Sequence, residues 1–155
     1  MTPAINLVRQ KKIAHQVHEY THDANSESYG LEAAEKLGLS PEQVFKTLVV
    51  EVDKKALVVG IVPVSAQLSM KQIAKAVGAK KAVMASPAEV ERSTGYVLGG
   101  VSPLGQKKRL KTVIDESARE FETIHVSAGR RGLEIELSPL DLQGLLDGMF
   151  APIQQ

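Results

Sequence analysis

The chain has 155 residues, which predicts a single domain spanning residues 1–155 with a hydrophobic core of its own. Hydrophobic residues make up 43% of the chain and charged residues 24%, so neither a disordered protein nor a coiled coil is expected, and no apolar run is long enough for a membrane span. The net charge of +1 argues against a general polyanion binder, and the absence of cysteine excludes disulfides, thiolate catalysis and cysteine-based metal sites.

The first third of the chain predicts short helices and one strand. Pro3 fits the first turn of a helix, and Gly38 follows a helical run as a C-terminal cap. The start of the sequence lacks the basic and long apolar segments of a secretory signal, so a cytoplasmic protein is expected. The expected elements are helix 3–13, strand 17–20, polar loop 21–29, helix 31–37 and a short helical turn opened by the capping-box pattern of residues 40–43.

A β-hairpin is the clearest signal in the middle of the chain. Two β-rich apolar runs are separated by the polar residues Asp53, Lys54 and Lys55. A second capping-box pattern, in residues 86–89, opens a short helix. The expected elements are strands 45–52 and 56–64, helix 69–77, strand 81–84, a helix from residue 86 to near Gly95, strands 112–115, 123–126 and 133–137, and helix 138–146.

This order of elements predicts an α+β fold with a mixed sheet. Helices and strands are interspersed, but the consecutive hairpins favour antiparallel pairing over a doubly wound parallel sheet. The glycine fingerprint of dinucleotide-binding folds and the Walker phosphate loop are both absent from the sequence, and we expect no cofactor.

Residues 92–105 form a glycine-rich segment that predicts either a binding loop or a plain connecting turn. Gly95, Gly99, Gly100 and Gly105 give the backbone conformational freedom, and Pro103 then restricts it. Amide N–H groups in such a loop can bind a phosphate, a carbonyl or a developing oxyanion. The basic residues that follow it are candidate phosphate contacts, although a solvated surface explains them equally well; they are Lys107, Lys108, Arg109 and Lys111.

A few other residues stand out as candidates for a site. Lys46 begins an apolar strand, so it either extends from the strand end to solvent or projects into a cleft, where it could hold a phosphate or a carbonyl oxygen. Tyr20 and Tyr29 flank the polar loop and either pack or line a pocket. Ser127 and Glu134 lie on either side of the turn formed by residues 129–132, either as surface residues or facing one site.

The remaining polar motifs predict no metal site and no catalytic triad. The histidines are His15, His18, His22 and His125, and they have no metal-binding signature, so we expect them on the surface or in packing roles. No G-x-S-x-G nucleophile elbow occurs, which argues against a Ser-His-Asp triad.

At Phe45-Lys46-Thr47, at residues 92–96 and at residues 99–105, the chain resembles the YbaK family, free-standing relatives of the editing domain of bacterial prolyl-tRNA synthetases. The resemblance covers essentially the whole chain and is greatest to the branch that removes cysteine from mischarged tRNA(Pro). It implies a mixed α+β fold with a curved, barrel-like sheet. It also implies an aminoacyl-tRNA deacylase that corrects an error of prolyl-tRNA synthetase.

The resemblance also implies roles for individual residues. Lys46 and Gly99 correspond to the catalytic lysine and to the first glycine of the Gly-x-x-x-Pro loop of this family. Tyr29 stands where phenylalanine is usual, which adds a hydroxyl, and Glu134 stands where aspartate is usual, which lengthens the carboxylate arm by one methylene. The implied substrate-binding residues are Tyr20, Tyr29, Thr47, Gly100, Val101, Ser102, Pro103, Ser127 and Glu134.

In this family the thiol of the bound cysteine is thought to attack its own ester carbonyl. The protein would then supply only positioning and oxyanion stabilisation, which suits a chain without cysteine. The implied partners are the acceptor end of an aminoacylated tRNA, whose phosphates would meet residues 107–111, and prolyl-tRNA synthetase, with no membrane partner. Two alternatives are a deacylase for alanine or serine and a non-catalytic module that binds tRNA or a nucleotide.

Overall fold

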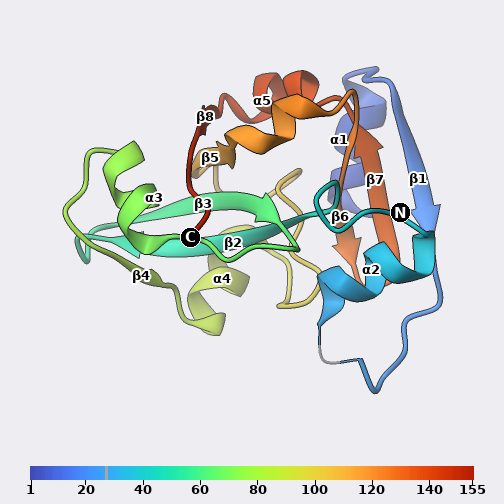
Figure 1. Ribbon diagram of the computed structural model, residues 1–155, viewed down its shortest axis with the longest axis horizontal. Helices are drawn as coiled ribbons and strands as arrows, with labels where there is room; N and C mark the ends of the chain where they lie inside the picture. The colour runs from blue at the N-terminus through green and yellow to red at the C-terminus, as the bar shows by residue number, and fades with distance from the viewer. Residues whose placement is uncertain (27) are drawn as a thin grey trace.

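The computed structural model describes residues 1–26 and 28–155, and it confirms the predicted α+β fold (Figure 1). Within these residues the strands form two sheets. The first has the order β1 (His15–Glu19), β7 (Leu133–Leu137), β6 (Ile124–Arg130), and the second has the order β4 (Ala82–Met84), β2 (Phe45–Val52), β3 (Ala56–Pro63), β5 (Lys111–Asp115), β8 (Met149–Ala151). Neither order closes on itself, so the strands form two open sheets where the resemblance implied a single barrel-like one.

The three-stranded sheet is antiparallel throughout. Its strand β6 is longer than the sequence predicts, because it continues beyond Val126 to Arg130. An irregularity in the pairing between Ser127 and Arg130 accommodates Gly129, whose φ of +111° suits glycine. Ser127 therefore lies within the strand, and not just past its end, directly opposite Glu134 of β7.

The five-stranded sheet mixes antiparallel and parallel pairs. The predicted hairpin is present, and Asp53 and Lys54 adopt left-handed conformations in its turn. Strand β5 runs parallel to both of its neighbours, β3 and β8. The sequence does not predict β8, because a run of three residues has no strand pattern of its own and depends on its pairing with β5.

Every α-helix in the described ranges begins after a serine or threonine whose hydroxyl accepts a first-turn amide. Residues 40–43 form a hydrogen-bonded turn, and the Gln43 side chain donates to the Thr123 carbonyl oxygen at 2.9 Å instead of completing a capping box. None of the helices in residues 1–26 and 28–155 is both long and apolar enough to cross a membrane. The helices are α1 (Pro3–Gln10), α2 (Tyr29–Leu37), α3 (Met70–Ala76), α4 (Pro87–Thr94), the 3₁₀ helix η1 (Glu116–Glu120) and α5 (Pro139–Leu146).

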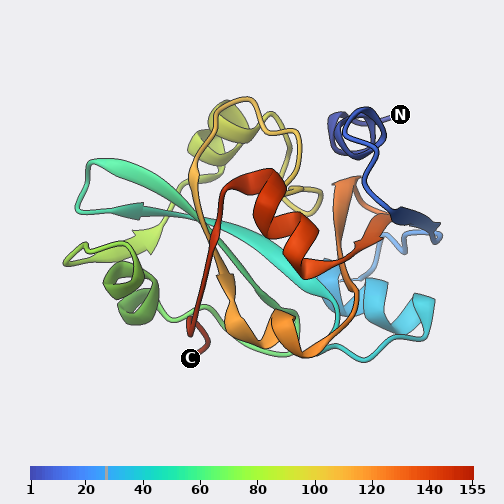
Figure 2. The same ribbon diagram turned by 90° about the horizontal axis from the view of Figure 1, so that it is seen from above.

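The two sheets meet at a junction in the middle of the molecule. Val44 forms an isolated parallel bridge with His125, and the His125 amide donates to the Gln43 carbonyl oxygen at 3.1 Å. The largest hydrophobic cluster packs residues of both sheets together, including Ile61 from β3 and Ile124 from β6. Figure 2 shows the β2–β3 hairpin with α3 at one end, the three-stranded sheet with α2 at the other, and α5 between them.

Candidate active site

A cavity of about 290 Å³ lies where the two sheets meet. Five separate segments of the chain line it: the residue after β1, the start of α2, the start of β2, the glycine-rich loop and the β6–β7 hairpin. The fold thus brings together residues that are more than 100 positions apart in the sequence. Of the predicted site residues, those lining the cavity are Tyr20, Tyr29, Lys46, Thr47, Gly99, Val101, Ser127 and Glu134.

Strand β2 places a cation and a hydroxyl in the cavity wall. Phe45 anchors the start of the strand in the core, where it is 2% exposed, and Lys46 and Thr47 follow it. Burial lowers the pKa of the half-buried Lys46 ammonium group. The Thr47 hydroxyl oxygen is buried and has no hydrogen-bond partner among the described residues. A buried polar atom without a hydrogen-bond partner costs stability. The Lys46 ammonium group and the Thr47 hydroxyl are therefore suited to binding a polar ligand that enters the cavity.

The β6–β7 hairpin places a hydroxyl and a carboxyl opposite each other. Ser127 and Glu134 are cross-strand partners, and the Ser127 hydroxyl accepts the Gly129 amide at 3.1 Å. Glu134 is only 7% exposed, and burial raises its pKa to about 8. Burial also raises the pKa of the Tyr20 phenol. Burial therefore favours the neutral form of the Glu134 carboxyl group, and a cationic ligand in the cavity would favour its ionised form.

The glycine-rich loop approaches the cavity too closely for side chains. Gly99 has a φ of +91°, and a Cβ atom there would lie 2.5 Å from Arg131 Nε and 2.8 Å from Tyr29 Cε2. A Cβ at Gly100 would lie 2.8 Å from Arg130 Cα. The Gly100 amide donates to the Val97 carbonyl oxygen at 3.0 Å, whereas the Gly99 amide donates to no oxygen of the described residues. The Gly99 N–H is thus available to a ligand.

The rest of the predicted loop site does not line this cavity. Gly100 is buried against the hairpin backbone. Ser102 is fully buried, and its hydroxyl accepts the Leu104 amide at 3.1 Å. Pro103 faces a different cavity. These three residues hold the shape of the loop, while Gly99 and Val101 face the site.

Glu32 holds His22 and Asp23 in the loop after Tyr20, a role that the sequence analysis missed. This α2 residue is 5% exposed, and its carboxylate lies 2.6 Å from His22 Nδ1 and accepts the Asp23 amide at 2.7 Å. Burial alone would raise the pKa of Glu32, but these hydrogen bonds outweigh burial and lower it. An acidic residue in the first turn of a helix is an ordinary sequence signal, so nothing in the sequence singled it out.

Arg130 and Arg131 also line the cavity, and the sequence analysis placed them only within the turn of residues 129–132. The guanidinium carbon of Arg131 lies 3.8 Å from the centre of the Tyr29 ring. Arg131 Nη2 donates to the Leu98 carbonyl oxygen at 3.4 Å. In the sequence, the feature that could have identified these two arginines is their position at the tip of the hairpin that carries Ser127 and Glu134.

The profile of the family described as "Aminoacyl-tRNA editing domain" matches residues 26–145. The chain belongs to this family. Among curated relatives, "Putative Cys-tRNA(Pro)/Cys-tRNA(Cys) deacylase EbsC" of Enterococcus faecalis is 39% identical over 98% of this chain and 92% of the relative. "Multifunctional Ser/Thr-tRNA deacylase ProXp-y" of Escherichia coli is 34% identical over 54% of this chain and 51% of the relative.

Solved structures show the same fold for this editing domain. A structure described as "a putative trans-editing enzyme for prolyl tRNA synthetase" superposes with a TM-score of 0.83 and 23% identity, covering 99% of this chain and 97% of the other. The hypothetical protein APE2540 superposes with a TM-score of 0.88 and 22% identity, covering 99% of each chain. The YbaK resemblance is thereby confirmed, and with it the assignment to aminoacyl-tRNA deacylases.

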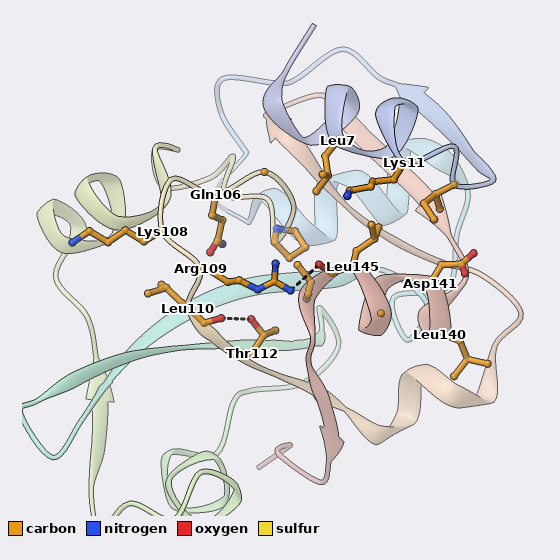
Figure 3. A pocket seen from close by; sticks show the side chains of 15 residues that line it. Leu7, Lys11, Gln106, Lys108, Arg109, Leu110, Thr112, Leu140, Asp141 and Leu145 are labelled. Atoms are coloured by element: carbon orange, nitrogen blue, oxygen red, sulfur yellow. Dashed lines mark hydrogen bonds between the residues drawn. The ribbon is translucent and has the colours of Figure 1, made fainter.

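The editing domain has a second, larger cavity of about 620 Å³ between α1, α5 and the segment after the glycine-rich loop (Figure 3). Lys108 and Arg109 of the predicted tRNA-binding cluster line it, together with Lys11 of α1, and Arg109 extends toward the Leu145 carbonyl oxygen. Lys107 and Lys111 are exposed outside this lining. The two cavities share no lining residue.

One trio of described residues in the editing domain is close enough together to hold a metal ion. Ligand atoms of His18, His125 and Glu136 lie within 4.8 Å of one another. His18 Nε2 lies 2.8 Å from Glu136 Oε1, and the Thr123 hydroxyl donates to Glu136 Oε2 at 2.6 Å. These hydrogen bonds give the carboxylate a structural role without an ion. His125 is 2% exposed, which agrees with the expected packing role.

Proposed function

We propose that this editing domain removes cysteine that has been mischarged onto tRNA(Pro). The observation that carries the proposal is the composition of the 290 Å³ cavity, in which a desolvated lysine and a buried carboxyl group occur without any histidine or cysteine among the described lining residues. Such a site binds and polarises a substrate but has no obvious nucleophile and base pair. The name of the Enterococcus faecalis relative supports the same substrate.

A substrate that brings its own nucleophile suits this cavity. The thiol sulfur of the bound cysteine attacks the ester carbonyl carbon, a C–S bond forms and the ester C–O bond breaks. The thiol proton ends on the ribose oxygen of the departing tRNA, and the amino acid leaves as a cyclic thiolactone. Because the attack is intramolecular, the protein needs to supply only orientation and charge stabilisation.

Each lining group has a role in this reaction. Lys46 and the Gly99 amide stabilise the negative charge that develops on the carbonyl oxygen. Glu134 binds the α-ammonium group of the amino acid. This positive charge favours the ionised form of the Glu134 carboxyl group inside the cavity. Tyr20, Thr47 and Ser127 orient the amino acid, and Tyr29 closes the cavity beside them.

The surroundings of the cavity fit a tRNA substrate. We propose that the acceptor end enters the 290 Å³ cavity while residues 107–111 contact phosphates farther along the RNA, with prolyl-tRNA synthetase as the partner that supplies the tRNA in the cytoplasm. Residues 1–155 act as one domain in this proposal, since both sheets contribute to the site.

A deacylase for serine is the alternative that one observation favours, because the Escherichia coli relative is named a Ser/Thr-tRNA deacylase. Serine carries a hydroxyl in place of the thiol, so water would have to act as the nucleophile.

Deacylation of a panel of mischarged tRNAs tests the proposal. The panel contains tRNA(Pro) charged with cysteine, serine or alanine, together with cysteine whose sulfur is methylated. We expect rapid release of cysteine and loss of that release on methylation. Equal release of methylated and free cysteine would rule out attack by the thiol, and preferential release of serine would establish the alternative.

A further inference from the structure

Arg131 is held at the cavity by contacts with two other segments of the chain. It extends from the β6–β7 hairpin, its guanidinium carbon lies 3.8 Å from the centre of the Tyr29 ring of α2, and Nη2 donates to the Leu98 carbonyl oxygen. Gly99 packs so closely that a Cβ atom would come within 2.5 Å of Nε. Stacking on an aromatic face and a hydrogen bond to a carbonyl oxygen restrict the orientation of the guanidinium plane before any ligand arrives.

The charges around this guanidinium are not balanced by the protein. The described ion pairs are His18–Glu136, His22–Glu32, Lys36–Glu32 and Arg92–Glu89, and none involves a residue lining the cavity. The described lining contains the cations Lys46, Arg130 and Arg131 and the single carboxyl group of Glu134. This excess of positive charge favours a ligand that carries a negative group.

The contacts of Arg131 leave part of its hydrogen-bonding capacity unused. A guanidinium group has five N–H donors, and one of them is accounted for by the Leu98 carbonyl oxygen. Its planar fork matches two oxygens of a phosphate better than a lysine ammonium group does. A phosphodiester is therefore the anionic group that this geometry recognises best.

The position of Arg131 decides which phosphate it meets. Lys108 and Arg109 of the basic cluster that the sequence suggested for phosphate binding line the second cavity, whereas Arg131 lines the same cavity as Lys46 and Glu134. A phosphate bound by Arg131 must therefore be near the ester that Lys46 polarises. In an aminoacyl-tRNA, that phosphate belongs to the 3′-terminal nucleotides.

We propose that Arg131, stacked on Tyr29, forms a phosphodiester subsite for the 3′ end of the RNA, next to the aminoacyl cavity. This subsite rests on the proposed function and assigns the terminal phosphate contact to the hairpin. In this subsite Tyr29 orients the Arg131 guanidinium group through the face of its ring.

Two substrates with the same aminoacyl group test the subsite. One is a short RNA ending in CCA that carries cysteine, and the other is 3′-O-cysteinyl adenosine, which has no phosphate. Arg131→Ala is expected to lower kcat/KM for the RNA at least about tenfold more than for the nucleoside, since one or two charge-assisted hydrogen bonds are lost. Arg131→Lys is expected to lie between the wild type and Arg131→Ala.

Arg119→Ala is the matched control, because Arg119 also stacks on an aromatic ring, that of Phe150 at 5.5 Å, and does not line the cavity. We expect it to leave the ratio of the two kcat/KM values unchanged. Equal losses on the two substrates with Arg131→Ala, or a loss on neither, would overturn the subsite.

A binding measurement separates this subsite from the proposed function. If the wild-type protein cleaves neither substrate, the proposed function fails, and the uncharged CCA-ending RNA still tests Arg131 by fluorescence anisotropy. In that measurement Arg131→Ala is expected to weaken binding about tenfold. Unchanged binding of the RNA would reject the phosphate contact.

Discussion

The cavity between the two sheets and the cavity beside α1 and α5 differ in size and in chemistry, and the smaller of them holds more buried polar groups. The cavity of about 620 Å³ has exposed cations on leucine-rich walls, whereas the cavity of about 290 Å³ holds a desolvated lysine, a nearly buried glutamate and an unpaired threonine hydroxyl. Burying polar groups without partners costs stability, so a fold keeps them where a ligand supplies the partner. For this reason we propose the smaller cavity, and not the larger one, as the reaction site.

The largest effect expected from this contrast is that of Lys46→Ala. Losing a group that stabilises a developing oxyanion lowers kcat about 10²- to 10³-fold, and the fold should persist because the burial of the lysine is itself unfavourable. Steady-state release of cysteine from tRNA(Pro) and the circular dichroism spectrum measure the two properties. Lys55→Ala, at the far end of the same hairpin, is the control. An activity within tenfold of the wild type would remove Lys46 from the reaction.

Glu134→Gln tests, through the pH dependence of protein stability, whether the smaller cavity holds a buried carboxyl group. Burial raises the pKa of Glu134 from 4.5 to about 8, so the folded state holds a proton that the unfolded state has lost. The wild type should therefore lose stability as the pH rises from about 4.5 through 8, and Glu134→Gln should gain on the order of 5 kcal/mol over the wild type above pH 8. Urea unfolding between pH 5 and 9 measures the difference.

Glu136→Gln is the matched control for this pH dependence, because the pKa of Glu136 is shifted in the opposite direction to that of Glu134. The hydrogen bond from Thr123 outweighs burial and lowers the pKa of Glu136, so its stabilising contribution is present above about pH 4.5 and disappears as the pH falls. This variant should be less stable than the wild type at neutral pH. If both variants respond alike to pH, burial of Glu134 is not the cause.

Gly99→Ala tests how closely the loop must approach the smaller cavity. The new Cβ meets Arg131 and Tyr29, and the φ of +91° is strained for alanine, so we expect a loss of about 1–3 kcal/mol of stability and a lower kcat/KM. Gly144→Ala in α5 is the control, since no atom lies within 4 Å of its Cβ, and it should gain up to about 1 kcal/mol. Thermal unfolding and deacylation compare the two. A fully active, stable Gly99→Ala would argue against a close backbone approach.

Arg109→Ala has the smallest expected effect and tests the larger cavity. If this cavity only contacts phosphates, the variant should weaken tRNA binding a few-fold and reduce the slope of log affinity against log salt by about one. Lys80→Ala, an exposed cation outside both cavities, controls for net charge. An unchanged slope would exclude the larger cavity from RNA binding.

Local signals in the sequence predicted most of the fold. The serine and proline pairs at residues 86–87 and 138–139 predicted helix starts, and both helices are present. The hairpin predicted around Asp53 is also present. Strand β8 was missed because it depends on a parallel neighbour, and the end of β6 was placed too early because the irregularity at Gly129 has no strand pattern.

The site was less predictable because it depends on tertiary contacts. Lys46 stood out as a charge in an apolar strand, but Glu32 and Arg131 act through packing between segments that are distant in the sequence. Residues 99–103 looked like one binding unit, whereas the left-handed conformation of Gly99 and the burial of Ser102 direct its parts to different places.

The junction between the two sheets has a consequence for how such a domain changes its substrate in evolution. Lys46 belongs to one sheet and Glu134 to the other, so no single hydrogen-bonded ladder fixes their separation. Their spacing depends on how the sheets pack at the Val44–His125 bridge and on core residues such as Ile61 and Ile124. Under the proposed function, replacing a methyl group in that core can therefore change which amino acid fits, while Lys46 and Glu134 themselves stay the same.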